Sequence, residues 1–489
     1  MIPLTLNEKA RRNNLTRCRE KKIVIPTFAQ MKNPGRIPTA IHHQLKEVGL
    51  WDVNPLNLFR ITWKNEPKES GGLYGGVNVL ELPTSLTGVR ARIVALVGKW
   101  FPTGAHKVGA TFGCLAPALV TGAFDSTWQK AVWPSTGNFC RGGAFNSALL
   151  GCESVAILPE GMSRERFEWL RRLAGEVIAT PGSESNVKEI FDKCWELKAT
   201  RKDVRIFNQF EEFGNYLWHY EVTGNAIGEM FDQLRRQDSK LNLSAFVSST
   251  GSAGTIASGD FLKQRYPGVK IGAAEALQCP TLLENGFGSH RIEGIGDKHV
   301  PWIHNVRNTD VVIDVDDNDC IRLLRLFNEG VGKEYLVKAG VDAATVSKLD
   351  LLGISGIGNV LASIKLAKYF ELGEHDVVVT VLTDSMQLYG SRLKELDAQF
   401  GAYADRDAVR DFHASCLGAD TSTMLELRHT DRRRIHNLKY FTWIEQQKRD
   451  IRELNAQWYD PEYWIAVQRL TPQIDNLIEV FNDELLKSS

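Results

Sequence analysis

Residues 92–109, RIVALVGKWFPTGAHKVG, place an apolar run directly before a turn of small residues and a helical pattern. The run from Arg92 to Val97 predicts a strand, and Lys107 lies where the next helix begins. Similar apolar runs recur at 130–133, 154–158, 176–179, 245–247, 270–273, 311–315 and 377–382. Short apolar runs that alternate with longer helical patterns are typical of parallel strands joined by crossover helices. The sequence therefore predicts an α/β fold with a mostly parallel sheet and helices on both faces.

The two ends of the chain differ from this body. Residues up to about Pro67 mix helix-like stretches with Pro and Asn, and a glycine-rich passage then leads into a strand-like run at 77–82. The apolar runs stop after Phe400, and from Asp407 onward the sequence reads as helices rich in Arg, Glu, Trp and Tyr. We therefore expect extensions before and after the body, the second of them helical.

The composition argues against a strongly charged partner. Lys plus Arg and Asp plus Glu both total 59, so the net charge is zero and favours neither nucleic acid nor a membrane surface. The arginines at 432–434 are interleaved with acidic residues, which favours a solvated or subunit-facing helix over nucleic-acid binding. The sequence contains neither a secretory signal nor an apolar run long enough to cross a bilayer. We expect a cytoplasmic protein that binds small molecules and other protein chains.

The eight cysteines are scattered along the chain. They form no C-x-x-C pair, and no histidine spacing suits zinc. We expect reduced, mostly structural thiols and no bound metal.

Lys107 is the first candidate for chemistry. In most proteins a lysine between small residues is simply a surface lysine. At the start of a helix and sheltered from water, however, an amine is favoured in its neutral form and can condense with an aldehyde. The rest of the sequence has to decide between these two interpretations.

Two loops supply that context. The loop Ser248-Ser249-Thr250-Gly251-Ser252-Ala253-Gly254-Thr255 follows an apolar run and precedes a helical stretch, so its backbone N–H groups can approach a phosphate. No Walker lysine follows it, which favours a phosphate on something other than a nucleoside triphosphate. The loop Ser135-Thr136-Gly137-Asn138-Phe139 has hydroxyl, amide and helix-end N–H groups that suit a carboxylate or a phenolic oxygen. Each loop alone is also compatible with an ordinary turn.

Taken together, these features match the requirements of pyridoxal 5'-phosphate (PLP). The cofactor needs an amine for its aldehyde, a cradle for its phosphate, a polar group opposite its pyridine nitrogen, and a carboxylate site for the amino acid. From about Leu80 to Asp397 the chain resembles fold type II PLP-dependent enzymes of the cysteine synthase and tryptophan synthase β superfamily. The resemblance rests on 103–107, 135–139, 158–166, 208–210, 250–255, 290–296 and 353–356.

The resemblance implies the architecture and the site. We expect two doubly wound, mostly parallel sheets, with an N-terminal extension at 1–79, a large PLP-binding domain at 80–130 and 240–400, a smaller mobile domain at 131–239, and a helical C-terminal extension at 401–489. Lys107 would carry the cofactor as a Schiff base. The other cofactor-binding residues would be Asn138, Thr250, Gly251, Ser252, Ala253, Gly254, Thr255, Ser355 and Thr383. The substrate-binding residues would be Ser135, Thr136, Gly137, Arg141, Gln209 and Gly294.

Either Ser355 or Thr383 would face the pyridine nitrogen. A neutral hydroxyl leaves that nitrogen largely unprotonated, which favours β-elimination chemistry over transamination. Tryptophan synthase β has a glutamate where this chain has Ser135, so a serine-to-tryptophan reaction is disfavoured.

A second difference lies at 140–143, where cysteine synthases have small apolar residues and this chain has Cys-Arg-Gly-Gly. Arg141 is then either part of a structural salt bridge or a site for a second anionic group on the substrate or co-substrate. Cys140 is best interpreted as a buried small hydrophobe.

The sequence thus predicts a PLP-dependent lyase or synthase that removes the α-proton of an amino acid and proceeds by β-elimination or β-replacement through an aminoacrylate. One alternative is a 2-amino-4-oxo-acid thiolase-type subunit that uses coenzyme A. Another is a catalytically silent PLP-binding regulatory subunit. As partners we expect a small amino-acid substrate and a second copy of the chain in a homodimer, with a small partner subunit as a further option.

Overall fold

Two β-sheets form the framework of this protein, one with seven strands and one with four. The structure is a computed structural model, and it describes residues 2–66, 73–135, 137–162, 164–182, 187–296 and 298–487. The chain divides into two compact units, and each contains one sheet. The first unit is Met1–Gly76, Trp100–Ala226 and Arg452–Ser489, and the second is Val77–Lys99 and Ile227–Ile451. The predicted fold class, with two mostly parallel sheets and helices, is confirmed.

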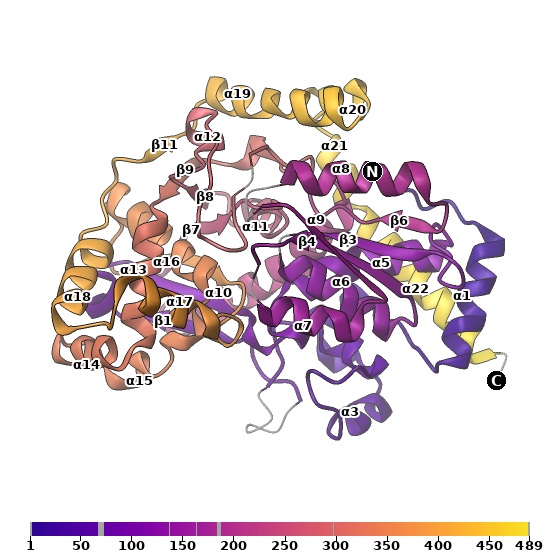
Figure 1. Ribbon diagram of the computed structural model, residues 1–489, viewed down its shortest axis with the longest axis horizontal. Helices are drawn as coiled ribbons and strands as arrows, with labels where there is room; N and C mark the ends of the chain where they lie inside the picture. The colour runs from indigo at the N-terminus through magenta and orange to yellow at the C-terminus, as the bar shows by residue number, and fades with distance from the viewer. Residues whose placement is uncertain are drawn as a thin grey trace. The chain divides into compact units, whose positions relative to one another are not determined.

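The sheet of the first unit is entirely parallel, in the order β5-β4-β3-β6. Figure 1 labels β3, β4 and β6. The strands of this sheet are β3 (Lys130–Pro134), β4 (Glu153–Pro159), β5 (Glu176–Thr180) and β6 (Val204–Ile206). Because parallel strands need crossover connections, a helix follows each of the first three. These helices are α6 (Asn138–Leu149), α7 (Arg164–Leu173) and α8 (Val187–Thr200). The apolar runs predicted at 130–133, 154–158 and 176–179 are therefore strands.

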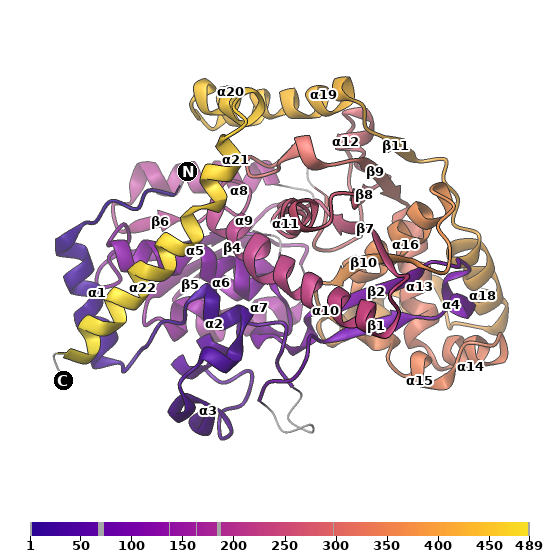
Figure 2. The same ribbon diagram turned by 180° about the vertical axis from the view of Figure 1, so that it is seen from behind.

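Helix α5 (Lys107–Thr121) is the centre of the first unit. Every residue of this helix after Lys107 is buried, and it contacts α6, α9 (Phe213–Trp218), α1 (Glu8–Glu20) and α22 (Leu470–Lys487). Contact with α9 requires glycine, because a Cβ on Gly113 would lie 2.2 Å from the Gly214 carbonyl oxygen. Helices α1 and α22 lie side by side (Figure 2), joined by an ion pair between Arg11 and Glu484 at 2.8 Å. The first and last helices thus both cover α5.

The first unit also contains several short elements. They are α2 (Phe28–Lys32), η1 (Pro34–Arg36), α3 (Thr39–Leu45), η2 (Pro55–Arg60), η5 (Pro102–Gly104), the π-helix η6 (His219–Thr223), α20 (Ile451–Tyr459) and α21 (Tyr463–Gln468). Helix α10 (Gly224–Gln237) begins in this unit and continues into the second.

The sheet of the second unit has the order β1-β2-β10-β7-β8-β9-β11 (Figure 2). Its strands are β1 (Val79–Leu82), β2 (Arg92–Val97), β7 (Asn242–Ser249), β8 (Lys270–Ala276), β9 (Val311–Val315), β10 (Asp376–Leu382) and β11 (Met424–Glu426). The five inner strands are parallel, and the two edge strands are antiparallel to their neighbours. Strand β10 is buried from Val377 to Leu382, which explains its nearly continuous apolar sequence.

Helices cover this second sheet, and α16 (Ile354–Tyr369) packs on β7, β9 and β10. The longer helices around it are α11 (Ser258–Arg265), α13 (Asp317–Asn328), α14 (Gly330–Lys338), α17 (Gly390–Phe400) and α19 (His429–Lys439). The short ones are α4 (Thr84–Thr87), η4 (Gly98–Trp100), η7 (Thr255–Ala257), α12 (Thr281–Glu284), η8 (Val306–Asn308), α15 (Ala343–Val346), η9 (Leu349–Leu351), η10 (Met386–Leu388), α18 (Asp405–Arg410), η11 (Asp411–Leu417) and η12 (Tyr440–Gln446).

The region after Phe400 is mostly helical, as predicted, but it also contributes one strand to the second sheet. Strand β11 pairs antiparallel with β9, with Met424 opposite Ile313. This strand has three residues and is at most half-buried, so its sequence lacks an apolar run. The arginines that follow are engaged within the second unit: Arg432 pairs with Asp310 at 2.9 Å.

Two buried carboxyl groups lie on neighbouring strands of the second sheet. Glu275 on β8 and Asp314 on β9 are register partners and are 3% and 0% exposed. The Glu275 carboxyl accepts hydrogen bonds from the N–H groups of Leu282 and Leu283. Burial raises the pKa of both carboxyl groups, and the adjacent Glu275 raises that of Asp314 further. The pair therefore retains a proton at a pH where exposed carboxyl groups have lost theirs.

All eight cysteines are buried and free of disulfides, in line with the predicted structural thiols. Among the described residues, no helix is both long enough and apolar enough to pass through a bilayer.

Candidate active site

Lys107 is the first residue of α5, as predicted. The turn before it contains two residues in the left-handed region, Thr103 and Gly104, both with φ of 69°. Such a conformation is strained for threonine and persists only where the surroundings hold it. The neighbours His106 and Val108 are buried, whereas Lys107 is half-buried. Of these three side chains, only that of the lysine is therefore partly accessible.

Polar groups from two other loops of the first unit surround this amine. The Lys107 Nζ donates to the Gln209 Oε1 at 3.3 Å, and the Gln209 Nε2 donates to the Ser135 Oγ at 3.3 Å. The Gly137 N–H also donates to that Oγ, at 3.1 Å. The structure thus brings Lys107 together with Gln209 and Ser135, which are more than 70 residues apart from each other in the chain.

The 135–139 loop joins β3 to α6. Asn138 is the first residue of α6, so the unpaired N–H groups of the first helical turn lie beside it. Ser135 and Asn138 are both buried. Thr136, predicted to bind the substrate carboxylate, lies outside the described residues. A helix start with an adjacent serine hydroxyl and glutamine amide suits a carboxylate.

Two arginines lie around this loop. The Arg141 guanidinium lies over the indole rings of Trp51 and Trp169, at 5.5 and 4.8 Å from their centroids. Cation–π contacts on both rings are a structural arrangement that the sequence interpretation did not consider. Arg166 ends the 158–166 segment, which resembles the family, but it was not predicted as a site residue. It is 2% exposed, and a Cβ on Gly137 would lie 2.5 Å from its Nη1. Positive charge is therefore concentrated beside the loop.

Cys140 is fully buried on the same helix. Burial raises the pKa of its thiol to about 12, so the thiol is protonated at neutral pH. This confirms the interpretation of Cys140 as a small hydrophobe.

The second unit contains the predicted phosphate loop. It begins after β7, where Thr250 donates from both its N–H and its hydroxyl to the Ala274 carbonyl oxygen, at 3.0 and 3.2 Å. Ala253 has φ of 56°, and η7 and α11 follow. Within the described part of the chain, the N–H groups of Gly251 and Ala253 donate to no protein acceptor. Donors of this kind in a turn before a helix are suited to a phosphate.

Gly251, Gly294 and Ser355 lie close together in the second unit. A Cβ on Gly251 would be 3.1 Å from the Gly294 carbonyl oxygen, and a Cβ on Gly294 would be 3.7 Å from the Ser355 Oγ. Gly294 has φ of 96°, which a side chain would disfavour. The Ser355 Oγ is buried without a hydrogen-bond partner in the described residues. Thr383, the other candidate, is half-buried just beyond the end of β10.

Two buried polar residues near these strand ends were missed in the sequence. Asn359, one helical turn after Ser355, accepts hydrogen bonds from the N–H and the hydroxyl of Ser249, at 2.9 and 2.5 Å. Asp384 accepts from the Tyr389 hydroxyl at 2.7 Å. The sequence pattern could have indicated both residues, because Asn359 is one helical turn from Ser355 and Asp384 directly follows Thr383. Polar residues at the carboxyl ends of parallel strands are frequent ligand-binding positions.

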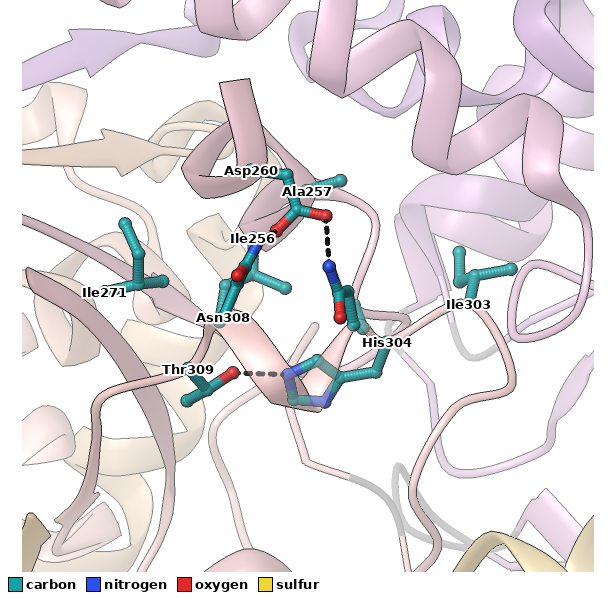
Figure 3. Close-up of a pocket in the computed structure, with 10 residues that line it drawn as sticks. Ile256, Ala257, Asp260, Ile271, Ile303, His304, Asn308 and Thr309 are labelled. Atoms are coloured by element: carbon teal, nitrogen blue, oxygen red, sulfur yellow. Dashed lines mark hydrogen bonds between the residues drawn. The ribbon is translucent and has the colours of Figure 1, made fainter. Parts of the chain in front are cut away.

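A small pocket adjoins the phosphate loop within the second unit (Figure 3). The Asp260 carboxylate on α11 accepts hydrogen bonds from the side-chain amides of Asn305 at 2.9 Å and Asn308 at 2.7 Å. The His304 Nε2 is 2.9 Å from the Thr309 hydroxyl. The contacts of Asp260 join α11, which follows the phosphate loop, to residues 305–308, and so stabilise the conformation of the phosphate loop.

Comparison with known proteins agrees with this donor set. Residues 99–384 match the family described as "Pyridoxal-phosphate dependent enzyme". Cysteine synthase of Staphylococcus aureus is 31% identical over 259 residues, which are 53% of this chain and 74% of that protein. Cysteine synthase B of Campylobacter jejuni is 31% identical over 291 residues, which are 59% of this chain and 86% of that protein.

Solved structures give the same result for the fold. A hydrogen sulfide-producing enzyme from Fusobacterium nucleatum superposes with a TM-score of 0.55 at 25% identity, covering 69% of this chain and 93% of that one. All the predicted cofactor residues, from Lys107 to Thr383, lie inside the region matched by the family. Because the matched region spans more than half of the chain, the protein belongs to the pyridoxal-phosphate dependent enzyme family.

Proposed function

We propose that this protein catalyses PLP-dependent β-elimination or β-replacement on an amino acid, in the manner of the cysteine synthases it resembles, with Lys107 as the catalytic amine. The observation that carries the proposal is the contact series from Lys107 through Gln209 to Ser135 at the start of α6. It places an amine beside groups that suit the carboxylate of an amino acid. The phosphate loop of the second unit supplies the second requirement of the cofactor, a set of N–H donors.

When bound, PLP would stabilise negative charge at the α-carbon of the amino acid, which β-elimination requires. Lys107 would hold the cofactor aldehyde covalently through its Nζ until the amino group of the substrate displaces it, and the freed amine would then accept the α-proton. Gln209 would hold the Nζ in place. Ser135, Gly137 and Gln209 would bind the substrate carboxylate, together with the undescribed Thr136.

In the second unit, we assign Thr250 to Thr255 to the cofactor phosphate. The buried, unpartnered Oγ of Ser355 supports Ser355 over Thr383 as the group facing the pyridine nitrogen, because a buried hydroxyl without a partner is costly unless a ligand completes it. Asn138 would bind the phenolic oxygen of the cofactor, and Gly294 would lie next to the substrate. A neutral serine favours elimination over transamination.

No described contact favours either alternative function. Arg141 makes cation–π contacts with two indole rings of the protein, and these contacts supply no evidence for coenzyme A. A silent regulatory subunit would have no chemical need for the full set of Lys107, Asn138 and Ser355. The functional domain boundaries, the homodimer, the small partner subunit and the cytoplasmic location remain predictions.

The decisive experiment is borohydride reduction of the PLP-loaded protein followed by peptide mapping. We expect the reduced cofactor on Lys107, and we expect Lys107→Ala to prevent attachment. Lys99→Ala is a matched control, because Lys99 lies eight residues before Lys107 in the sequence and pairs with Asp350 instead. A modified peptide elsewhere in the chain would overturn the assignment. An amino-acid panel, monitored for β-elimination products, would then identify the substrate.

A further inference from the structure

A series of contacts inside the first unit connects the N-terminal region to the lysine turn. The Trp63 Nε1 donates to the Thr223 Oγ1 at 3.0 Å, and that Oγ1 is 2.9 Å from the His219 Nδ1. The His219 ring meets the His106 ring edge to face, with 4.9 Å between centroids and 76° between planes. His106 immediately precedes Lys107. We call Trp63, Thr223, His219 and His106 the Trp63–His106 chain.

All four members of this chain are 1% exposed or less. Both His219 and Thr223 belong to η6, a π-helical turn between α9 and α10. Single π-turns inside α-helices are rare and frequently occur at functional sites. Here the π-turn places the imidazole of its first residue and the hydroxyl of its last residue within hydrogen-bond distance.

One donor in the chain is fixed by its chemistry. An indole N–H only donates, so the Thr223 oxygen accepts from Trp63. The direction of the hydrogen bond between the Thr223 hydroxyl and the His219 Nδ1 depends on the His219 tautomer. Burial lowers the pKa of His219 and of His106 well below the ordinary value, and the neighbouring Lys107 adds to this for both. Both imidazoles are therefore neutral next to the catalytic amine.

Trp63 also covers the strained turn directly. Its ring packs edge to face against Phe101 at 4.9 Å and against His106 at 5.6 Å. These two residues bracket the turn that contains Thr103 in the left-handed region. Strain of this kind persists only when surrounding contacts determine the conformation. A single indole thus holds both ends of the turn that presents Lys107.

We propose that Trp63, Thr223 and His219 are positioning residues for Lys107, acting through His106 and the turn at 101–106. This inference rests on the proposed role of Lys107. Its consequence is that the N-terminal region takes part in the active site, although Trp63 lies outside the region 99–384 that the family matches. The other three members, His106, His219 and Thr223, lie inside that region.

The test measures how fast PLP becomes covalently attached to Lys107 in the cofactor-free, full-length protein, followed by absorbance after mixing. Thr223→Val keeps the side-chain shape but removes the hydroxyl. We expect attachment to slow about fivefold, which corresponds to the loss of one buried hydrogen bond of roughly 1 kcal/mol. Trp63→Phe should have a similar effect, and Thr223→Ser, which restores the hydroxyl, should return the rate to that of the wild type.

Ser147→Ala is the matched control. The Ser147 Oγ accepts from the indole N–H of Trp133 at 2.9 Å, also buried in the first unit, but these residues have no contact with the lysine turn among the described interactions. Thr223→Val and Ser147→Ala should lower the thermal midpoint to a similar extent, and only Thr223→Val should slow attachment.

Two outcomes would overturn the inference. One is a wild-type attachment rate in Thr223→Val; the other is equal slowing in Thr223→Val and Ser147→Ala, which would show a general loss of stability. Failure of the proposed function is a different result, because attachment would then persist in Lys107→Ala.

Discussion

We predict that Asp314→Asn removes a pH dependence from the stability of the second unit. Asp314 and Glu275 are buried register partners on β9 and β8, and burial raises the pKa of both carboxyl groups. The charge of Lys365 lowers the pKa of Asp314 and that of Arg434 lowers the pKa of Glu275, but burial outweighs both effects. An asparagine can donate its amide hydrogen to the Glu275 carboxylate, which keeps its hydrogen bonds from Leu282 and Leu283. The variant therefore lacks the proton that Asp314 retains in the wild type, while burial still raises the pKa of Glu275.

The sign follows from proton linkage. Unfolded carboxyl groups lose their protons near pH 4, whereas the folded pair still holds one at higher pH. A raised folded pKa contributes stability that is fully present below the unfolded pKa and is lost as pH rises through the folded one. While one proton separates the two states, the wild type loses about 1.4 kcal/mol per pH unit relative to the variant. For a unit of this size that corresponds to about 3–5 °C in thermal midpoint.

The assay compares thermal midpoints of wild type and Asp314→Asn at pH 5.5, 6.5 and 7.5. At each step up in pH, we expect the thermal midpoint of the wild type to fall relative to that of Asp314→Asn. Glu275→Gln should behave in the same way. Asp316→Asn is the control: burial opposes the shift, but hydrogen bonds from Asn318 and Gln278 lower the pKa of Asp316. Its contribution is lost only at acidic pH. A constant difference between wild type and Asp314→Asn across this range would refute the reasoning.

Three further predictions concern single positions. In a cofactor titration, Gly251→Asp should weaken PLP binding at least about tenfold, because its side chain would press on Gly294 and its charge would repel a phosphate. The control Gly268→Asp, which has open space around its side chain, should leave PLP binding unchanged. Gly113→Ala should destabilise the protein by about 1–3 kcal/mol, because its Cβ would clash with the Gly214 carbonyl oxygen. Urea unfolding measures this against the control Gly175→Ala, and equal stabilities of the two variants would mean that α5 and α9 can move apart. Arg141→Met should lower the thermal midpoint by losing two cation–π contacts and leave PLP affinity unchanged, while a selective loss of kcat/KM would favour the anionic-substrate hypothesis instead.

Much of the fold was predictable because the central strands are buried on both faces. Runs such as Val377 to Leu382 must be apolar throughout, and this distinguishes them from helices and loops. Strands β6 and β11 lacked that signal, since each has three residues that are not fully buried. Their pairing depends on the neighbouring strand rather than on their own sequence.

The candidate site divides in the same way. Lys107 and the phosphate loop were predictable because each is a local pattern of small residues next to a helix start. The cation–π contacts of Arg141 with Trp51 and Trp169 were not, because they depend on residues distant in the chain that only folding brings together. The position of Arg166 against Gly137 has the same origin.

The contact of α22 with α5 has a consequence for synthesis of the protein. Helix α5 is apolar on all sides, yet one of its covering helices is the last in the chain. At translation rates of about 5–20 residues per second, the ribosome needs tens of seconds to produce the intervening chain. During that time the nascent first unit exposes apolar surface on α5, so its folding is completed only when α22 has been made. A chaperone that binds apolar helices would be expected to associate with the ribosome-bound chain.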